Sequence, residues 1–208
     1  MEDHPLSQPG TMHDVVRHER QMLLAYTYQR CGGTDTVERA VDYAARCHAG
    51  QSRDGGEPYI IHPIRVAIHL TVFYEDEISQ DDVAVAVLHD VLEDTPGLTR
   101  EELAAAFGDP VATAVDCLSR KTARRKMSIS EYYQAILAAP KLVKVIKLCD
   151  RLDNILSLHT CPDRAKIRRY VEFTNSHYPR LGAEAHHGLT AVILSEVIRI
   201  ERSSSGEI

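Results

Sequence analysis

The chain has 208 residues, with 24 Lys and Arg against 30 Asp and Glu, which gives a net charge of −6. A chain of this length favours a single domain and can bury a core without disulfides or a structural metal. Its acidic balance argues against duplex DNA and anionic membranes as partners, because both reward a basic surface.

Helical periodicity runs through the chain, and we find no convincing strand. The predicted helices, in chain order, cover 13–30, 35–48, 64–74, about 80–93, a short segment between Thr99 and Gly108, 110–118, 129–138, 141–158, about 162–175 and 188–202. The segment 51–63 is too rich in Gly and Pro to be regular, the segment 120–126 is a basic loop, and the final SSSGEI is a frayed tail. The pattern predicts an all-α, compact bundle of roughly nine or ten helices.

Capping signals mark where several of these helices begin. Ser79 with Asp82, and Thr99 with Glu102, have the spacing of a capping box, in which side chain and backbone satisfy each other. No repeat, linker or composition shift interrupts the series. We therefore expect one domain over 1–208, with an N-terminal extension of about 1–33.

The five cysteines form no CxxC pair, and their odd number suits reduced thiols better than a disulfide framework. The first residues are polar, and no run approaches the roughly 18 consecutive apolar residues of a membrane span. We therefore expect a soluble, cytoplasmic protein with no membrane partner.

Three segments place polar side chains suited to chemistry among core-forming neighbours. They are YIIHPIRVA with His62, AVLHDVLED with His89-Asp90 and Glu93-Asp94, and KLCDRLDN with Asp150 and Asn154. On a helix, residues four apart share a face, and three such pairs occur: His89 with Glu93, Asp90 with Asp94, and Asp150 with Asn154. Because buried charges need partners or a metal, we interpret these side chains as one site.

The central set of that site is His62, His89, Asp90 and Asp150. Two imidazoles and two carboxylates suit Mn²⁺, Fe²⁺ or Zn²⁺, and ligand type alone does not choose among them. An ion with open positions activates water for attack on phosphorus. Glu93 and Asp94, one turn beyond, would orient that water or move its proton. The residues alone predict a metal-dependent phosphohydrolase.

Other candidate residues fit structural roles better. A second His-Asp pair, His13-Asp14, has no other ligand-like neighbours, so we expect it at the surface. His69 lies in an apolar helix and is expected at a satisfied core or boundary position. Cys149 is expected to pack as a small hydrophobe.

The motifs closely resemble those of the HD-domain metal-dependent phosphohydrolases, and within them the hydrolase domain of RelA/SpoT-type proteins and the stand-alone small alarmone hydrolases. The matching stretches are AARCHAGQSRDGGEPYIIHPIRVA (44–67), AVAVLHDVLEDT (84–95), EELAAAFGDPVATAV (101–115) and VIKLCDRLDNILSL (145–158), with YPRLGAEA (178–185) as a looser echo. The resemblance thus runs from about 35 to 185 and is carried by four ordered motifs.

The resemblance implies an HD fold in which Mn²⁺ is held by His62, His89, Asp90 and Asp150, with Fe²⁺ and Zn²⁺ still open. The implied reaction, part of the stringent response, removes the 3′-pyrophosphate from (p)ppGpp and gives GDP or GTP plus pyrophosphate. Because no second domain follows the matching region, we expect hydrolysis without synthesis.

The resemblance also implies roles for four residues around that ion. Glu93 and Asp94 would assist the hydrolytic water. Arg53 and Asn154 would lie in the nucleotide pocket, where a planar guanidinium stacks on a purine or grips a phosphate.

Three departures from the family pattern concern the pocket. Asp54 stands where the family often has a basic or small polar residue, which puts an acid beside a polyphosphate. Cys149 and Asp153 replace an Ala and a His of the family's KLADRLHN, so the surroundings of the metal ligand differ. The residues Leu118–Lys121 replace a common Val-Thr-Lys-Leu and lead into the basic loop.

Two further functions stay open from the sequence. The first is an HD phosphohydrolase of a related nucleotide, such as (p)ppApp or the 2′-phosphate of NADPH, and Asp54 motivates it. The second is a non-catalytic, nucleotide-binding regulatory module, against which the intact ligand set speaks.

The partner expected in every case is a small nucleotide polyphosphate, not DNA. Either of two basic clusters would border the pocket, 120–126 or the set Arg164, Lys166, Arg168 and Arg169. The helix at 13–30 is a candidate surface for a homodimer, which the sequence does not decide.

Overall fold

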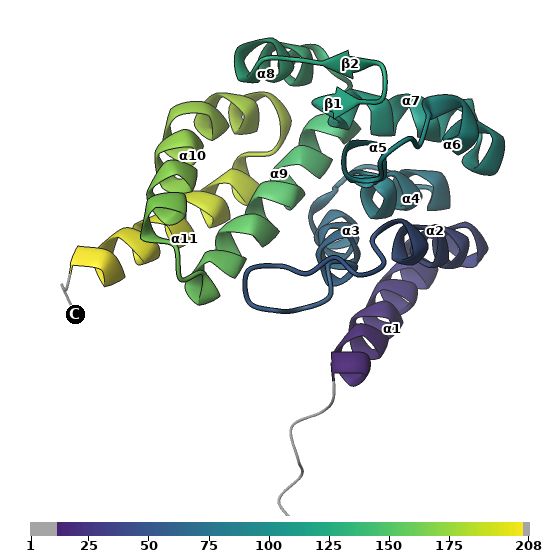
Figure 1. The fold of residues 1–208 in the computed structure, drawn as a ribbon, viewed down its shortest axis with the longest axis horizontal. Coiled ribbons are helices and arrows are strands. Elements are labelled where there is room, and N and C mark those ends of the chain that lie inside the picture. The colour runs from purple at the N-terminus through teal and green to yellow at the C-terminus, as the bar shows by residue number, and fades with distance from the viewer. Residues whose placement is uncertain (1–11, 206–208) are drawn as a thin grey trace, which may run out of the picture.

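A computed structural model describes residues 12–205 of the chain, and Figure 1 shows their fold. The elements are α1 (Met12–Cys31), α2 (Asp35–Cys47), α3 (Ile61–Phe73), α4 (Gln80–Leu88), α5 (Val91–Asp94), α6 (Arg100–Phe107), α7 (Asp109–Leu118), β1 (Lys121–Thr122), β2 (Arg125–Lys126), α8 (Ile129–Ala138), α9 (Lys141–Ser157), a 3-10 turn (Leu158–Thr160), α10 (Arg164–Ala185) and α11 (His187–Ser205). The expected all-α bundle is confirmed, and residues 1–11 and 206–208 lie outside the described part.

The helix starts follow the local chemistry of the sequence. Ser79 and Thr99 each accept a hydrogen bond from the third residue of their helix, and that residue's carboxylate accepts from the cap in return. Ser128 forms a third capping box with Glu131. These reciprocal bonds satisfy backbone groups that a helix end leaves free, so α4, α6 and α8 begin where side chains support them.

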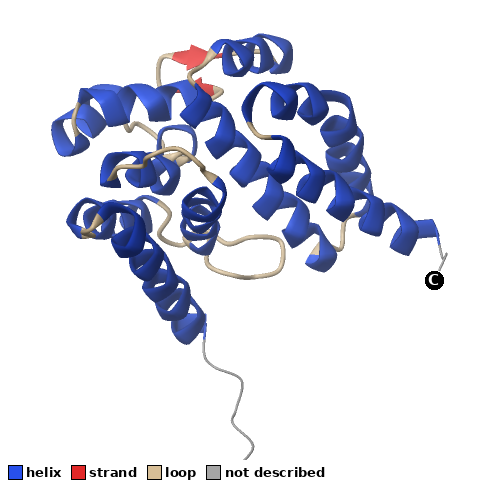
Figure 2. Cartoon of the chain, turned by 180° about the vertical axis from the view of Figure 1, so that it is seen from behind, coloured by secondary structure: helices blue, strands red, loops and turns tan. Residues whose placement is uncertain are grey.

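Several local predictions are corrected by the structure. Helix α10 continues to Ala185 rather than ending near 175, α11 includes residues 203–205 of the expected frayed tail, and α3 begins at Ile61 inside the expected irregular segment. The helix expected at 80–93 is broken at His89 and Asp90, which separate α4 from α5. The basic loop 120–126 contains a small antiparallel hairpin, with Lys121 opposite Lys126 and Thr122 opposite Arg125. Figure 2 shows this hairpin as strands at the edge of an otherwise helical molecule. The hairpin is held by Arg125, which donates to the Asp116 carboxylate and to the carbonyls of Asp116 and Ser119, and apolar periodicity does not report such polar contacts.

Helix α9 is the centre of the packing, where it contacts α3, α7, α8, α10 and α11. Figure 1 shows it running obliquely between the N-terminal helices and the α10–α11 pair. Its neighbour α3 also packs on α1 and α4. Side chains such as Ile64, Leu70, Leu88 and Leu148 are fully buried among these helices. The core therefore fixes α3, the α4–α5 junction and α9 relative to one another, and these are the three elements that carry the candidate site.

None of the helices between residues 12 and 205 is both long and apolar enough to cross a membrane.

Candidate metal centre

Four side chains from three elements converge between α3, the α4–α5 junction and α9. His62 Nε2 lies 3.3 Å from Asp150 Oδ1 and 3.5 Å from Asp90 Oδ2. His89 Nε2 lies 3.1 Å from the same Asp90 oxygen and 3.9 Å from Asp150 Oδ1. The structure therefore brings together all four of the metal ligands expected from the sequence.

The orientation of both imidazoles is fixed from behind. His62 Nδ1 lies 2.7 Å from Asp153 Oδ2, and His89 Nδ1 lies 2.8 Å from the carbonyl oxygen of Ala86 near the end of α4. A carboxylate and a carbonyl only accept hydrogen bonds, so each Nδ1 carries a proton. Both Nε2 atoms consequently face the cluster.

Asp90 and Asp150 are held by donors from other parts of the fold. Tyr59 donates its hydroxyl to Asp90 Oδ2 at 2.8 Å, and Lys147 donates to Asp150 Oδ2 at 2.6 Å. Asn154 donates its amide to the other Asp150 oxygen. These donors therefore fix the orientation of both carboxylates.

The charges of the cluster depend on one another. Burial opposes ionisation of Asp90, but contacts with His89 and His62 hold its pKa well below its usual range. Burial also opposes ionisation of Asp150, but Lys147 and His62 lower its pKa. Burial disfavours protonation of His62, yet hydrogen bonds to Asp150, Asp153 and Asp90 raise its pKa. These shifts favour a protonated His62 beside ionised Asp90 and Asp150.

The arrangement fits a divalent metal. Ligand atoms of His62, His89 and Asp90 all lie within 4.8 Å of one another, and Asp150 reaches both histidines. His89 Nε2 is buried and has no hydrogen-bond partner, although Asp90 Oδ2 lies 3.1 Å away. Such an unsatisfied buried nitrogen is costly unless something binds it. Two nitrogen and two oxygen donors are a set that Mn²⁺, Fe²⁺ and Zn²⁺ accept.

The two acids expected to assist water lie in α5, which begins directly after Asp90. Glu93 Oε2 accepts a hydrogen bond of 2.8 Å from the backbone N–H of Arg120, which precedes the hairpin. Burial and the neighbouring charge of Asp90 raise the pKa of Asp94. Glu93 is therefore tied to the β1–β2 hairpin, whereas Asp94 is placed to hold a proton more readily than an ordinary aspartate.

Arg53 is largely buried rather than on a flexible surface loop, with 10% of its side chain exposed. It donates to Asp153, to Asn154 Oδ1 at 3.1 Å and to Ser157 Oγ at 2.7 Å, all on α9. With Asn154 it lines a hollow of about 180 Å³ that also includes His62 and Tyr59. The two expected substrate residues therefore flank a pocket that opens beside the metal cluster.

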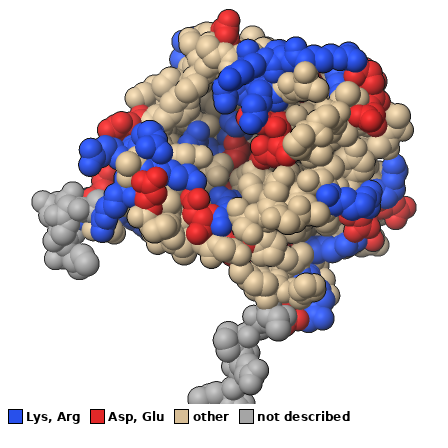
Figure 3. All heavy atoms as spheres, viewed as in Figure 1, with Lys and Arg blue, Asp and Glu red and all other residues tan. Residues whose placement is uncertain are grey.

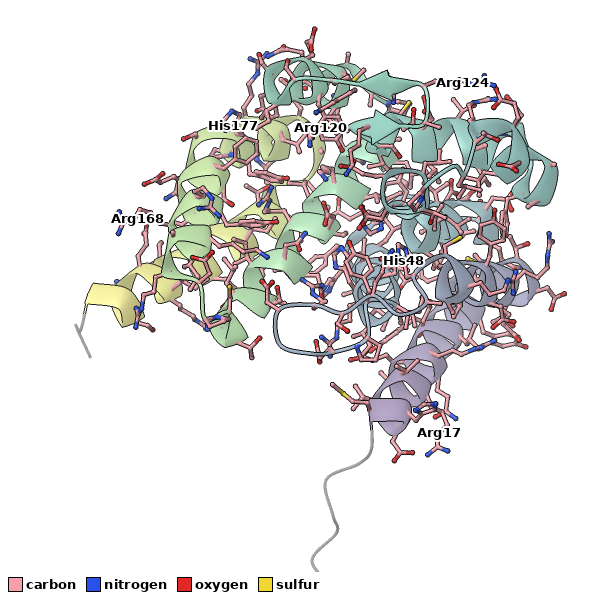
Figure 4. All side chains as sticks on the ribbon, in the orientation of Figure 1. Arg17, His48, Arg120, Arg124, Arg168 and His177 are labelled. Carbon is pink, nitrogen blue, oxygen red and sulfur yellow. The ribbon has the colours of Figure 1, made fainter. Side chains whose placement is uncertain are left out.

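Asp54, the acid beside Arg53, lies on the rim of the same pocket. It forms an ion pair of 2.6 Å with Lys166 of α10, and Cys161 donates to it at 3.4 Å. Lys166 therefore borders the pocket, whereas Arg164, Arg168 and Arg169 are exposed. In Figure 4 the labelled Arg168 points away from the body of α10.

The other basic cluster borders a different hollow, beside Glu93. This hollow is lined by Lys121, Thr122, Arg124 and Lys126 of the hairpin together with Glu93. Figure 3 shows Lys and Arg side chains gathered over the hairpin at the top of this face, above red acidic side chains near the centre. Each basic cluster therefore lies near the site: Lys166 borders the pocket of Arg53, and the hairpin borders the hollow beside Glu93.

Three supporting residues were not expected from the sequence, or not in the role they have. Tyr59 and Lys147 carried no motif of their own, although both hold a carboxylate of the cluster. Asp153 stood out as a departure from the family pattern, and the structure shows that it holds both His62 and Arg53. Its position three residues after Asp150 on a helix was the signal available for it.

Among the weaker candidates, His13 is exposed and Cys149 is buried, as expected. His69 is half-buried, but its buried Nε2 has no hydrogen-bond partner, so the expectation of a satisfied histidine is wrong. Burial lowers the pKa of His69, which favours its neutral form and reduces the cost of the missing partner.

Comparison with known proteins agrees with this geometry. A family model described as HD domain matches residues 40–185, most of the chain and all of the cluster. The chain belongs to the HD domain family.

Curated relatives are named either as 3′-pyrophosphohydrolases or as GTP pyrophosphokinases. A guanosine-3′,5′-bis(diphosphate) 3′-pyrophosphohydrolase of Aquifex aeolicus is 38% identical over 147 residues, which are 69% of this chain and 20% of that protein. A GTP pyrophosphokinase of Myxococcus xanthus is 35% identical over 161 residues, 71% of this chain and 21% of that protein. The chain thus spans about a fifth of the length of these relatives.

A solved structure shares the fold. It is described as a metazoan ortholog of SpoT that hydrolyses ppGpp, and it matches with a TM-score of 0.66 at 23% identity. The match covers 83% of this chain and 97% of that one. At this identity the likeness shows the HD fold and nothing finer.

Proposed function

We propose that this HD domain hydrolyses the 3′-pyrophosphate of the alarmone (p)ppGpp, giving GDP or GTP plus pyrophosphate, with Mn²⁺ as its metal. The observation that carries the proposal is the convergence of His62, His89, Asp90 and Asp150 beside a pocket lined by Arg53. The name of the Aquifex aeolicus relative, a guanosine-3′,5′-bis(diphosphate) 3′-pyrophosphohydrolase, supports this substrate over other phosphate esters.

The four converging residues would hold the ion, and the hydrogen-bond partners behind them would keep these residues in place. When bound, the ion lowers the pKa of water and withdraws charge from the phosphoryl group. Asp153 and the Ala86 carbonyl keep both histidines in the tautomer that presents Nε2. Tyr59 and Lys147 keep the two carboxylates directed inward, so little reorganisation is needed on binding.

Proton transfer falls to the two acids of α5. Glu93, fixed by the Arg120 amide, would orient the attacking water and accept its proton. Asp94, whose pKa burial and Asp90 raise, would hold a proton for the leaving group. The attacking water forms the new P–O bond, the bond from phosphorus to the ribose 3′-oxygen breaks, and that oxygen takes up a proton.

Arg53 would bind the nucleotide from the opposite side of the pocket. Its guanidinium is already ordered by Asp153, Asn154 and Ser157, so it loses little freedom when it stacks on a purine or meets a phosphate. Lys166 and the hairpin residues Lys121 and Lys126 would supply positive charge for the phosphates. We also propose the cytoplasm as its compartment, on the basis of five cysteines that are all free.

Separate incubation of the Mn²⁺-loaded protein with ppGpp, pppApp and NADPH, followed by anion-exchange chromatography, tests the substrate. We expect ppGpp to be converted to GDP and pyrophosphate faster than the others are cleaved. If ppGpp stays intact while another nucleotide is consumed, the assignment to guanosine alarmones is wrong.

A related nucleotide is the second candidate, and Asp54 is the observation that favours it. Its carboxylate lies on the pocket rim, where it would repel a phosphate unless Lys166 stays paired with it. Asp54→Lys should shift preference toward the more highly charged substrate if this acid sets selectivity. An unchanged ratio of kcat/KM between ppGpp and pppApp would remove Asp54 from that role.

A further inference from the structure

Asp153 is a residue of the site to which the sequence motifs assigned no role. It stands where the KLADRLHN pattern has a His, and only 3% of its side chain is exposed. A carboxylate this deeply buried must be compensated by nearby donors or charges. The residues that compensate Asp153 belong to two different functional groups.

A single oxygen of Asp153 serves both groups. Its Oδ2 accepts from His62 Nδ1 at 2.7 Å and also from Arg53 Nη1. His62 belongs to the candidate metal cluster, whereas Arg53 lines the nucleotide pocket. The two donors therefore share the negative charge of one atom.

Sharing that atom makes the two interactions depend on each other. A carboxylate behind a ligating imidazole increases the basicity of the nitrogen that faces the metal. The positive charge of Arg53 draws on the same carboxylate and reduces this effect. When a nucleotide attracts Arg53, Asp153 is free to act more strongly on His62.

A second bridge runs beside the first but carries no charge. Arg53 donates to Asn154 Oδ1, and the Asn154 amide donates to Asp150 Oδ1. This neutral amide transmits position rather than charge. The charged connection between pocket and cluster is the one through Asp153.

We propose that Asp153 is a positioning residue that couples Arg53 in the nucleotide pocket to His62 in the metal centre, so that engagement of Arg53 by a nucleotide strengthens metal binding. The inference rests on the proposed function in that the cluster holds a metal and Arg53 meets the substrate. Because binding linkage is reciprocal, a bound metal also favours release of Arg53 toward the nucleotide.

The coupling is measured without nucleotide, by calorimetric titration of Mn²⁺ into four metal-free proteins: wild type, Arg53→Gln, Asp153→Asn and the double variant. Asp153→Asn should weaken Mn²⁺ binding by about tenfold or more, as loss of a partner behind a ligand does. Arg53→Gln should tighten Mn²⁺ binding by about fivefold when Asp153 is present and by less than about twofold when it is not.

Two controls make the result specific. Asp42→Asn makes the same chemical change on α2, where Asp42 pairs with Arg20 at the surface, and should leave Mn²⁺ affinity unchanged. Asp153→His installs the family residue and tests the coupling if the amide variant fails to fold. It too should abolish the effect of Arg53→Gln.

If Arg53→Gln changes Mn²⁺ affinity equally with and without Asp153→Asn, the coupling is overturned. Arg53 would then act on the metal only through its positive charge and not through Asp153. An Asp153→Asn variant with wild-type Mn²⁺ affinity would also overturn the coupling. Absence of Mn²⁺ binding in the wild type overturns the metal centre and the coupling together. If the coupling is observed but ppGpp stays intact, the proposed substrate fails and the role of Asp153 stands.

Discussion

At the scale of single residues, the site depends on side chains that hold its ligands as much as on the ligands. His62, Asp90 and Asp150 are each held by a hydrogen-bond partner, in Asp153, Tyr59 and Lys147. The motifs predicted the ligands, because two imidazoles and two carboxylates in apolar surroundings indicate a metal. They did not predict Tyr59 and Lys147, since a tyrosine or lysine in such segments is equally typical of packing or of a solvated face.

Lys147 provides the first test at this scale. Lys147→Met removes the donor from Asp150 and leaves that carboxylate less compensated, which should lower the free energy of unfolding of the metal-free protein by about 2–4 kcal/mol. Urea denaturation measures the change. Lys144→Met, on the same helix, breaks an ion pair with the partly exposed Glu184 and should cost less than about 1 kcal/mol. Equal losses in the two variants would contradict the special role of Lys147.

Glu93 provides the second test at the scale of single residues. Glu93→Gln keeps an oxygen for the Arg120 N–H but loses the charge that accepts a proton, so turnover of ppGpp should fall by about a hundredfold or more. Mn²⁺ affinity, measured on the same preparation, should stay within about twofold of wild type, because Glu93 is not placed in the ligand set. Loss of Mn²⁺ binding would instead make Glu93 a ligand.

At the scale of elements, the site is built at a helix break and beside a hairpin. Both lie where side chains satisfy backbone groups: His89 Nδ1 donates to the Ala86 carbonyl, and Arg125 donates to the carbonyls of Asp116 and Ser119. Apolar periodicity predicted a continuous helix and a loop at these two places. It could not predict the break or the hairpin, because it records the spacing of apolar residues, whereas these contacts run from polar side chains to backbone carbonyls.

The hairpin gives a prediction at this scale. Arg125→Gln removes its attachment to α7, so amides in 120–127 should exchange with deuterium faster and turnover should fall, because Arg120 then positions Glu93 poorly. Mn²⁺ affinity should not change. Arg124→Gln, at the tip of the hairpin where Figure 4 shows Arg124 directed outward, should alter neither exchange nor turnover. Identical behaviour of the two variants would refute the anchoring role.

At the scale of the whole molecule, a chain of net charge −6 is proposed to bind a polyanion. The two facts are compatible because acidic side chains from the α4–α5 junction and α9 converge on one point. A divalent cation bound there would neutralise their negative charge. Basic residues then lie nearby on the hairpin and on α10 (Figure 3). Composition alone could exclude general nucleic-acid binding, whereas only the fold shows that the negative charge is locally concentrated.

A proton on His62 and a metal ion should compete for the same site, and this competition should change the stability of the whole protein with pH. Contacts with Asp150, Asp153 and Asp90 outweigh burial and raise the folded pKa of His62 above its unfolded value. Its proton therefore stabilises the metal-free protein fully below about pH 6.5, and this contribution is lost as the pH rises through the folded pKa. The increase in Tm caused by saturating Mn²⁺ should consequently grow from pH 6 to pH 8. Scanning calorimetry with and without Mn²⁺ measures it, and an increment that shrinks over this range would contradict the assignment.

The most direct test of the metal centre is a Mn²⁺ titration followed by electron paramagnetic resonance, in which free Mn²⁺ gives the signal and bound Mn²⁺ does not. Wild-type protein should remove one ion per chain from solution, and neither Asp90→Asn nor Asp150→Asn should remove any at the same concentration. Undiminished binding in either variant would contradict the centre formed by His62, His89, Asp90 and Asp150.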